Sequence, residues 1–490
     1  MTLNVAQTQT STQKVLSLPP GPQSLQDVLR LVRDRKRSPI ALYQRLQQQY
    51  GDIVYLKIGR IETVLLNDLD AIQSVLQTQA KFYHKGPGYE RLRTLIGQGL
   101  LTSEGDFWRK QRKLAAPAFH AKQIAHALSQ IAPFIEEKVK SWKHGSPVSI
   151  TREMNAIALE IVRRTLLGAQ VDMDSEEVRK AVAEALKFAD ESGSNWLRML
   201  DLLIPSHDGN LAFRVERNLP LPKVYRFKKS LTHLTRIVNE MIRSRREKGL
   251  ENYGDDLLGA FMAAHDEEDG SVMNDQQLRD EVMTMLLAGH ETTATALTWT
   301  WLMLHQQRNE ALKVYQEVDQ FWKDQGDRPL ELEDLGRLPV TLHFFEETLR
   351  FYPPFWRITR TALCDQSLGG FKIPNGATIL ISPQFSHQDP RVWGDPHRFR
   401  PARFESHEKS TRHKFAFLSF GGGHRACIGS NFAVMEALLI LVTALRHVRF
   451  ELTQTGEIQT EATITLKPKG GLPAKVIRRD YSSQKVEQLK

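Results

Sequence analysis

Residues from about 107 to 350 carry an almost unbroken helical pattern, and this run constrains the fold more than any other feature of the sequence. Apolar residues recur there every three to four positions, which is the period of an amphipathic helix. The chain has 490 residues, and no internal repeat, low-complexity segment or Gly/Ser linker divides it. The sequence therefore predicts one large, mainly α domain. We expect its long helices at about 122–143, 151–168, 176–193, 222–248, 274–306, 308–324 and 428–445.

A small β portion is expected on either side of the helical run. Ile53–Ile58 and Ile61–Leu66 are short, apolar and joined through Gly59-Arg60, as in a hairpin. Residues 386–414 are rich in Pro, Arg, His and Asp without any period, which predicts an ordered irregular loop. Further strands are expected at 358–364, 377–382, 447–453 and 462–467.

The domain is expected to span residues 18–480. Residues 1–17 are polar and predict a disordered N-terminal tail, and residues 481–490 predict a C-terminal tail. The N-terminal segment lacks the apolar core of a signal peptide or a membrane anchor, so we expect a cytoplasmic protein. Val282 to Leu304 is apolar enough to resemble a membrane span, but its six threonines and Glu291 favour a buried helix of a soluble protein.

The charge balance says little about function. Lys and Arg exceed Asp and Glu by 66 to 57, which gives a formal net charge of +9. That excess suits either a solvated basic surface or a dock for an acidic protein partner. No block of five or more basic residues is present, so we expect no nucleic-acid partner, and we expect a monomer.

Cys427 is the first candidate for chemistry. The chain has two cysteines, Cys364 and Cys427, which excludes a disulfide framework. Cys427 follows a glycine-rich turn and precedes an apolar helix, and Arg425 lies two residues before it. A helix N-terminus and a nearby arginine both favour a thiolate. On this evidence alone the residue suits either a buried inert cysteine or a thiolate ligand of heme iron.

Two other motifs resemble known binding sites but lack residues that those sites require. Gly421 to Ala426 satisfies G-x-G-x-x-A, but no acid stands about 20 residues on and no βα alternation follows, so a dinucleotide site is not expected. His290-Glu291-Thr-Thr-Ala294 lacks the second histidine that a zinc helix requires.

The residues around Cys427 resemble the signature of the cytochrome P-450 superfamily. Phe420, Gly423, Arg425, Cys427 and Gly429 occupy the five defined positions of F-x-x-G-x-R-x-C-x-G. The resemblance extends over about residues 18–480 and is to a soluble bacterial-type member. It implies a mostly helical triangular prism, with heme b buried between a long central helix and the cysteine loop. Four more segments resemble motifs of the same superfamily: Trp108–Arg112, Ala288–Thr293, Glu347–Arg350 and Phe399–Phe404.

The resemblance implies that Cys427 is the axial thiolate ligand of the heme iron. Trp108 and Arg112 are four residues apart, hence neighbours on one helix face, and both can donate to a carboxylate such as a heme propionate. Without the resemblance, the pair would more often be a surface cation–π contact. The implied heme-binding set is Trp108, Arg112, Ala288, Arg357, Phe420, Gly421, Arg425, Cys427 and Gly429.

Glu347, Arg350 and Arg403 are implied to form a buried structural triad behind the cysteine. By themselves, Glu347 and Arg350 would be read as an exposed pair contributing less than about 1 kcal/mol. Ala402 departs from the superfamily pattern, which usually has an acidic residue at that position.

The central helix is expected to begin at Asn274, with Gln277 completing a capping box. The resemblance implies a local widening at Gly289. It also implies that Glu291 and Thr292 are catalytic and deliver the two protons that cleavage of the O–O bond requires. A lone threonine in mid-helix can instead bond back to its own helix.

The substrate side is less specified. Leu101, in the segment Gly99–Ser103, is expected to form a pocket wall together with Ala288 and Thr292. Because no charged anchor is evident, we expect a small lipophilic substrate such as a fatty acid or a terpenoid.

The implied reaction is RH + O2 + two electrons + two protons giving ROH + H2O. Nothing in the chain resembles a flavin or iron–sulfur domain, so electrons are expected from a separate ferredoxin- or flavodoxin-type protein. A peroxide-using or isomerising enzyme of the same fold, or a non-catalytic heme-binding protein, are the alternatives.

Overall fold

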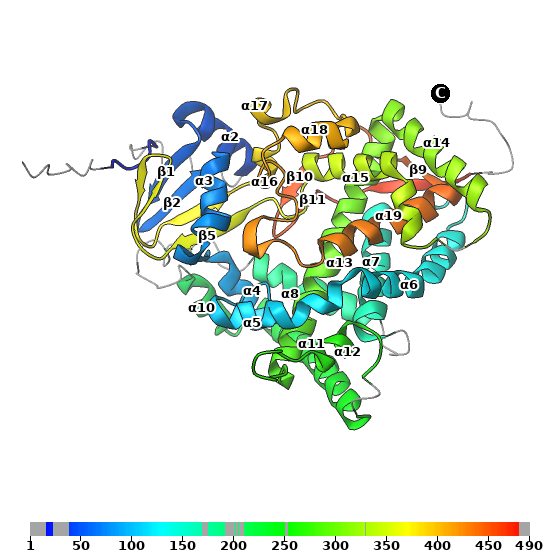
Figure 1. Cartoon of the computed structure of the whole chain (residues 1–490), viewed down its shortest axis with the longest axis horizontal. Coiled ribbons are helices and arrows are strands. Elements are labelled where there is room, and N and C mark those ends of the chain that lie inside the picture. The colour runs from blue at the N-terminus through cyan, green and yellow to red at the C-terminus, as the bar shows by residue number, and fades with distance from the viewer. Residues whose placement is uncertain are drawn as a thin grey trace, which may run out of the picture.

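The computed structural model describes residues 16–22, 39–168, 175–191, 201, 204, 210–249, 253–328 and 330–479. Its outline is roughly triangular, with the blue and yellow strands at the left, red strands toward the upper right and helices filling most of the rest (Figure 1). The expected mainly α fold with a small β portion is confirmed. The residues expected to form the two tails lie, apart from residues 16–17, outside the described ranges.

The long helices form where the periodicity predicted them. The helix expected at 428–445 begins two residues later, and the end expected at 193 falls outside the described residues. They are α6 (Ala121–Ser141), α7 (Ile150–Leu167), α8 (Ser175–Glu191), α11 (Pro222–Glu247), α13 (Asp275–Gln306), α14 (Arg308–Gln325) and α19 (Ser430–His447). One further long helix, α15 (Pro339–Phe351), was not among those expected. The shorter helices are α2 (Pro39–Tyr50), α3 (Leu69–Gln73), α4 (Gly88–Ile96), α5 (Gly105–Ala115), α10 (Leu211–Arg217), α12 (Leu257–Ala263), α16 (Pro383–Ser386), α17 (Pro390–Trp393) and α18 (Ser406–Thr411).

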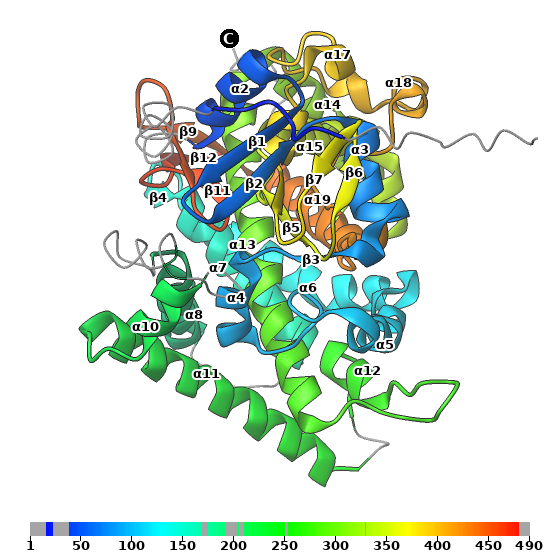
Figure 2. The same ribbon diagram turned by 90° about the vertical axis from the view of Figure 1, so that its left-hand side faces the viewer.

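Helix α13 runs through the middle of the molecule (Figures 1 and 2). Its start is the expected capping box: Asn274 accepts from the Gln277 N–H at 2.9 Å, and the Gln277 side chain accepts from the Asn274 N–H at 2.8 Å. The helix packs against α7, α11, α14, α15 and α19. Its residues up to Leu287 belong to one hydrophobic cluster and those from Ala294 to another. The segment Ala288–Thr293, which resembles the motif of the superfamily's central helix, lies between these two clusters.

The strands form one five-stranded sheet and smaller pieces. In the large sheet β2 and β8 are parallel and the other neighbours are antiparallel. Its order is β1 (Ile53–Ile58), β2 (Ile61–Leu66), β8 (Thr378–Ile381), β5 (Ile358–Ala362) and β3 (Tyr83–Lys85). A second sheet has the order β4 (Pro147–Ser149), β12 (Pro473–Arg478) and β9 (Val448–Leu452). Two ribbons pair β6 (Gln366–Leu368) with β7 (Phe371–Ile373), and β10 (Thr460–Ala462) with β11 (Leu466–Pro468).

Two expectations about the C-terminal part were wrong. The strand expected at 462–467 is the ribbon β10–β11, which folds back on itself because Ala462 pairs with Leu466. The segment 386–414 is not wholly irregular: it contains α17, the 3-10 turn Pro401–Phe404 and α18. Prolines start both α17 and the 3-10 turn, where a missing N–H costs a helix nothing.

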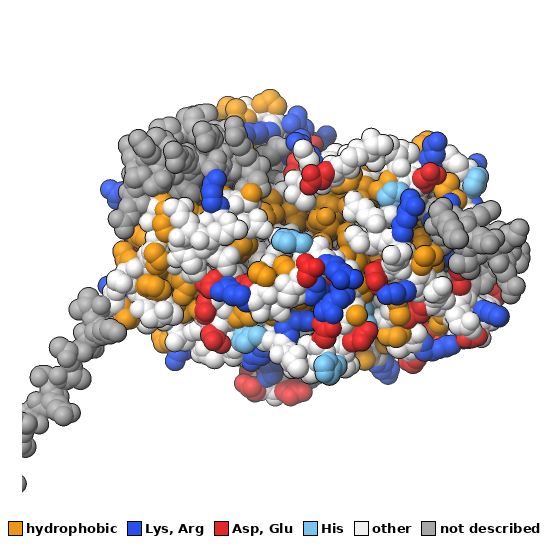
Figure 3. Space-filling model, turned by 90° about the horizontal axis from the view of Figure 1, so that it is seen from above, with side chains coloured by type: hydrophobic (Ala, Val, Ile, Leu, Met, Phe, Trp, Pro, Cys, Tyr) orange, Lys and Arg blue, Asp and Glu red, His pale blue; other side chains and the backbone are white. Residues whose placement is uncertain are grey.

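One helix of the described residues, α19, has the length and mean hydropathy of a membrane span, with 56% of that window buried inside the fold. It reads as a core helix, since ten of its residues from Glu436 to Leu445 are buried. On the face seen in Figure 3, acidic and basic side chains are intermixed, so the net positive charge does not form a single basic patch there.

Candidate active site

Cys427 lies in a tight loop between the 3-10 turn Gly423–Arg425 and α19. Its N–H donates to the Phe420 carbonyl at 2.9 Å, which closes the loop. Gly421 and Gly423 have φ of +73° and +65°, which side-chain-bearing residues rarely adopt. A Cβ on Gly423 would lie 1.9 Å from the Leu76 carbonyl oxygen. The glycines of the motif are therefore required by the shape of the loop.

The thiol of Cys427 is accessible to solvent although protein atoms surround it on most sides. Burial raises the pKa of the Cys427 thiol, whereas the Gly429 N–H and the Arg112 guanidinium act to lower it. The two opposing groups are those a thiolate needs, a backbone donor and a cation.

Helix α5 brings both expected residues to the cysteine loop. Arg112 donates through Nη1 to the Ala426 carbonyl at 3.0 Å, next to Cys427. The guanidinium carbon of Arg425 lies 3.7 Å from the centroid of the Trp108 ring. Trp108 and Arg112 thus contact the loop from one helix face, as their spacing predicted.

Three cations meet beside this loop, and we call Lys85, Arg360 and Arg425 the cationic cluster. Lys85 of β3 and Arg360 of β5 are directly paired across the sheet. Burial lowers the pKa of Arg425 to about 10, against the raising effect of Glu104, and Arg360 adds to the lowering. Burial also lowers the pKa of Lys85, and Arg425 and Arg360 lower it further. Like charges placed opposite each other on a sheet are destabilising unless something compensates them.

Glu104 supplies partial compensation, since its carboxylate pairs with Arg425 and accepts from the Lys85 N–H at 2.7 Å. One carboxylate against three cations leaves positive charge in a largely enclosed place. A group with two carboxylates, such as heme, fits this donor set, and Cys427 fits as its ligand. Lys85, Arg360 and Arg425, together with Trp108 and Arg112, would hold it.

The structure separates Arg357 from this cluster. Its guanidinium carbon lies 5.0 Å from the Trp356 ring centroid, whereas Arg360 is 7% exposed and lies among the cations. Residues Ile358, Arg360 and Ala362 form the buried face of β5, so Arg360 stands at an inward position of the strand. That alternation was a usable signal for Arg360, and the sequence interpretation missed it. Lys85 was missed because nothing local marks it.

One face of α13 is partly accessible in a helix that is otherwise mostly buried. Met285, Ala288, Gly289 and Thr292 keep accessible surface, at the spacing of a single helix face. The Thr292 hydroxyl donates to the Ala288 carbonyl at 2.7 Å, which is the back-bonding alternative for a threonine in mid-helix. Its oxygen can still accept a hydrogen bond.

The helix is regular through Gly289, so the expected widening is not a π-turn in the described residues. A Cβ on Gly289 would lie 3.1 Å from Val162 Cγ2, so this glycine permits close packing of α7. The Glu291 carboxylate accepts from the Thr465 hydroxyl at 3.0 Å, in the turn between β10 and β11. His290 is buried, and burial lowers its pKa.

Leu101, the expected pocket wall, lies in the loop between α4 and α5 and is partly accessible. It packs against the same hydrophobic cluster as Trp108, Met285 and Ile428. This cluster therefore joins the loop, α5, α13 and the segment after Cys427 at one place.

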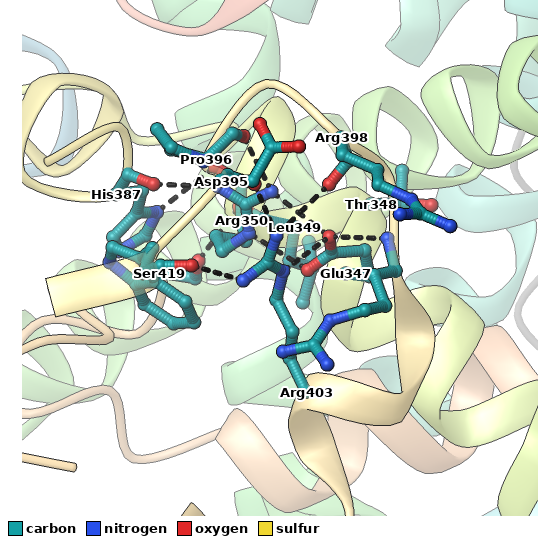
Figure 4. Close-up of polar contacts among 12 residues, drawn as sticks. Glu347, Thr348, Leu349, Arg350, His387, Asp395, Pro396, Arg398, Arg403 and Ser419 are labelled. Atoms are coloured by element: carbon teal, nitrogen blue, oxygen red, sulfur yellow. Dashed lines mark hydrogen bonds and ion pairs between the residues drawn. The ribbon is translucent and has the colours of Figure 1, made fainter. Parts of the chain in front are cut away.

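Glu347, Arg350 and Arg403 lie together, with side chains exposed by 0%, 0% and 3% (Figure 4). Arg350 donates to both Glu347 oxygens, through Nε at 2.8 Å and Nη2 at 2.9 Å. Arg403 Nε lies 3.5 Å from Glu347 Oε1, and its other nitrogens donate to the carbonyls of Trp393 and Asp395. The three charges thus tie α15 to the segment that follows α17.

His387, which the sequence did not single out, connects this triad to the cysteine loop. Its carbonyl accepts from Arg350 Nη1 at 2.7 Å, and its Nδ1 bonds the Arg350 carbonyl at 3.2 Å. Its Nε2 accepts from the Leu418 N–H at 2.8 Å. Burial, with a smaller effect of Arg350, lowers the pKa of His387 to about 3, so it remains a neutral acceptor. His387 therefore links the triad, through Arg350, to Leu418 in the segment that leads to Cys427.

Comparison with known proteins gives a consistent result. The family model for cytochrome P450 matches residues 19–473. Cyclooctatin synthase of Streptomyces melanosporofaciens is 34% identical over 80% of this chain and 81% of its own. Pentalenene oxygenase of Streptomyces avermitilis is 30% identical over 85% of this chain and 88% of its own. The crystal structure of the cytochrome P450DA heme domain superposes with a TM-score of 0.81 at 25% identity, covering 96% of this chain and 99% of that one.

Proposed function

Because the chain belongs to the cytochrome P450 family and is a monooxygenase of that family, we propose that it hydroxylates a lipophilic, terpenoid-type substrate with electrons from a separate protein. Two relatives are named for cyclooctat-9-en-7-ol and pentalenene, which favours a cyclic terpenoid over a linear fatty acid. Apart from Glu291, whose carboxylate is held by Thr465, the partly accessible residues of α13 between Met285 and Thr292 are uncharged, which supports an apolar substrate.

The observation that carries the proposal is the position of the cationic cluster beside the Cys427 loop. Arg425 belongs to both, and Trp108 and Arg112 reach the loop from α5. When bound, a heme with a thiolate ligand supplies the chemistry of O–O bond cleavage. The chain's own part is to hold the thiolate, neutralise the propionates and present an apolar wall.

Proton delivery is assigned to Thr292 and Glu291. Thr292 lies on the accessible face of α13. Its hydroxyl donates a hydrogen bond to the Ala288 carbonyl, and its oxygen can still accept another. Glu291 is adjacent and partly accessible, with Thr465 fixing its carboxylate. A hydroxyl beside an acid is a suitable arrangement for a proton relay.

The electron donor is proposed to be a ferredoxin- or flavodoxin-type protein, because two cysteines cannot hold an iron–sulfur cluster that needs four. We also propose that the enzyme is a cytoplasmic monomer.

The test uses the purified holoenzyme with NADPH and surrogate ferredoxin and flavodoxin systems. Cyclic terpenes and linear fatty acids of matched carbon number are screened by the heme spin-state shift and then by product analysis. Hydroxylated terpene with oxygen from labelled O2 is the expected result. Product formed with hydrogen peroxide but not with O2 and NADPH would favour the peroxide-using alternative, and heme loading without any product would favour a binding protein.

A further inference from the structure

Two adjacent acids of α13, Asp280 and Glu281, bind the backbone of the loop that carries Leu101. The Gln98 N–H donates to Asp280 Oδ2 at 2.7 Å, and the Leu100 N–H donates to Glu281 Oε2 at 3.0 Å. Gln98 and Leu100 are two positions apart in the loop, and their partners are adjacent in the helix. A buried loop amide without such a partner would cost the free energy of a lost hydrogen bond.

The loop is shaped to fit closely on these acids. Gly97 has a φ of +64°, and a Cβ there would lie 2.2 Å from the Asp280 carboxylate. A Cβ on Gly99 would lie 2.1 Å from the Thr284 hydroxyl oxygen. Both glycines let the backbone approach the helix more closely than other residues could.

The other side of the loop is held by the cationic cluster. Lys85 Nζ donates to the carbonyls of Leu100, at 3.4 Å, and Leu101. Arg425 Nη1 donates to the Ser103 carbonyl at 2.9 Å. The segment Gly97–Ser103 is thus fixed between α13 and the cluster, and the position of Leu101 depends on both.

Both acids are buried, with exposures of 5% for Asp280 and 0% for Glu281, although neither residue needs to be buried for α13 to form. Asp280 Oδ1 is held by Gln276 at 2.8 Å and by Arg279 at 2.6 Å, which leaves Oδ2 for the loop. Glu281 Oε1 is buried without a hydrogen-bond partner among the described residues. Burial raises the pKa of Glu281 to about 8, with Asp280 raising it and the Leu100 N–H and Lys85 lowering it. Burying an acid in this way is costly unless its contact serves a purpose.

We propose that Asp280 and Glu281 are positioning residues that fix the loop Gly97–Ser103 on α13 and thereby set which substrate shapes fit beside Leu101. The inference rests on the proposed function, since it takes the loop as a wall of the substrate site. A fixed wall discriminates between rigid ligands by shape, whereas a loosened wall accepts ligands of different shapes more equally.

The first experiment measures the loop itself. Hydrogen–deuterium exchange is followed in the heme-loaded wild type, Asp280→Ala and Glu281→Ala, with Asp275→Ala at the exposed start of the same helix as control. Loss of one acceptor is expected to speed exchange of the loop amides about tenfold, while the control leaves them unchanged. Glu281→Gln keeps an acceptor for the Leu100 N–H and should exchange like the wild type. Unchanged loop exchange in both alanine variants would overturn the proposal.

A second variant approaches the contact from the loop side, in case removal of a buried acid impairs folding. Gly97→Ala places a methyl group against Asp280 without removing any charge. It should speed exchange of the same amides, and unchanged exchange in a folded Gly97→Ala would contradict the inferred fit.

The second experiment measures selectivity. Dissociation constants for terpenes of increasing ring size are obtained from the spin-state shift. The ratio between the best and worst ligand should fall at least about fivefold in Glu281→Ala and Gly97→Ala, with heme content and the carbon monoxide spectrum unchanged. Faster loop exchange with an unchanged ratio would show that the loop does not shape the site. If the wild type bound no terpene, the proposed function would fail, and the exchange data would still decide the positioning of the loop.

Discussion

Thr293 of the central helix donates to Glu436 of the helix that follows Cys427, across 3.3 Å. Glu436 is 1% exposed, and its Oε1 has no hydrogen-bond partner among the described residues. Burial raises the pKa of this carboxyl from 4.5 to about 8, and the Thr293 hydroxyl lowers it only in part. The contact between α13 and α19 is therefore made by an acid that is protonated at neutral pH.

A pH dependence of stability follows from Glu436. Between pH of about 4.5 and 8 the folded protein keeps this proton and the unfolded chain does not, so stability falls as pH rises through that window. The slope from one such group is about 1.4 kcal/mol per pH unit. Glu436→Gln, which is neutral at every pH, should flatten the decline in melting temperature between pH 5 and 8. An equal decline in wild type and variant would show that Glu436 is not protonated in the folded state.

The thiolate assignment predicts a spectroscopic outcome. Cys427→Ser should abolish the red-shifted absorption of the reduced carbon monoxide complex, because a serine oxygen lacks the strong electron donation of a thiolate sulfur even if it ligates the iron. Cys364→Ser serves as the control. Cys364 is exposed and lies just after β5, so this variant should keep the red-shifted band. Retention of the red-shifted band in Cys427→Ser would remove Cys427 from the site.

The buried triad predicts a loss of stability. Glu347→Ala leaves Arg350 and Arg403 without their carboxylate, and breaking a buried pair costs about 3–5 kcal/mol. Glu310→Ala breaks another pair at the same spacing, Glu310 with Lys313, whose side chains are 27% and 59% exposed. It should cost less than about 1 kcal/mol. Melting temperature and heme content measure both, and equal effects would contradict the burial of the triad.

The cationic cluster predicts a difference between two arginines that are three residues apart. Arg360→Ala should weaken heme retention, measured by transfer of heme to apomyoglobin, because a charged hydrogen bond contributes about 1.5–3 kcal/mol. Arg357→Ala removes a guanidinium that lies on Trp356 and should leave retention near that of the wild type. The reverse order would restore Arg357 as the propionate partner that the resemblance implied.

These arginines also show what sequence reasoning could reach. The capping box at Asn274 is local and could be predicted from spacing alone. The cysteine loop is a contiguous motif, so it could be assigned from its resemblance to the family signature. Arg360 could have been separated from Arg357 by the alternation of Ile358, Arg360 and Ala362 along β5, a signal that the sequence interpretation did not use. Lys85 becomes meaningful only when the sheet pairs it with Arg360, a partner 275 positions further along the chain.

His387 and β12 were missed for similar reasons. His387 acts through a carbonyl and both ring nitrogens on partners far apart in the sequence, and no motif marks such a residue. Strand β12 alternates buried Ala474 and Val476 with exposed residues, but its charged residues weakened the apolar signal. Its pairing with β9 and β4 supplies the stability that its own composition does not.

Thr292 provides the test that separates chemistry from packing. Its hydroxyl donates to Ala288 at 2.7 Å, and Thr298 makes the same bond to Ala294 at 2.7 Å on a fully buried part of α13. Both alanine variants lose one helical back-bond, so their effects on stability should be similar. Thr292→Ala should also lower the ratio of hydroxylated product to NADPH consumed, with the missing electrons leaving as hydrogen peroxide, because the hydroxyl of the proposed proton relay is lost. Thr298→Ala should keep the wild-type ratio. A hydrogen-peroxide-driven assay should suffer less in Thr292→Ala than the O2-driven assay, since peroxide already carries both electrons and both protons. An unchanged product ratio in Thr292→Ala would mean that its hydroxyl serves the helix alone and that protons reach the site by another route.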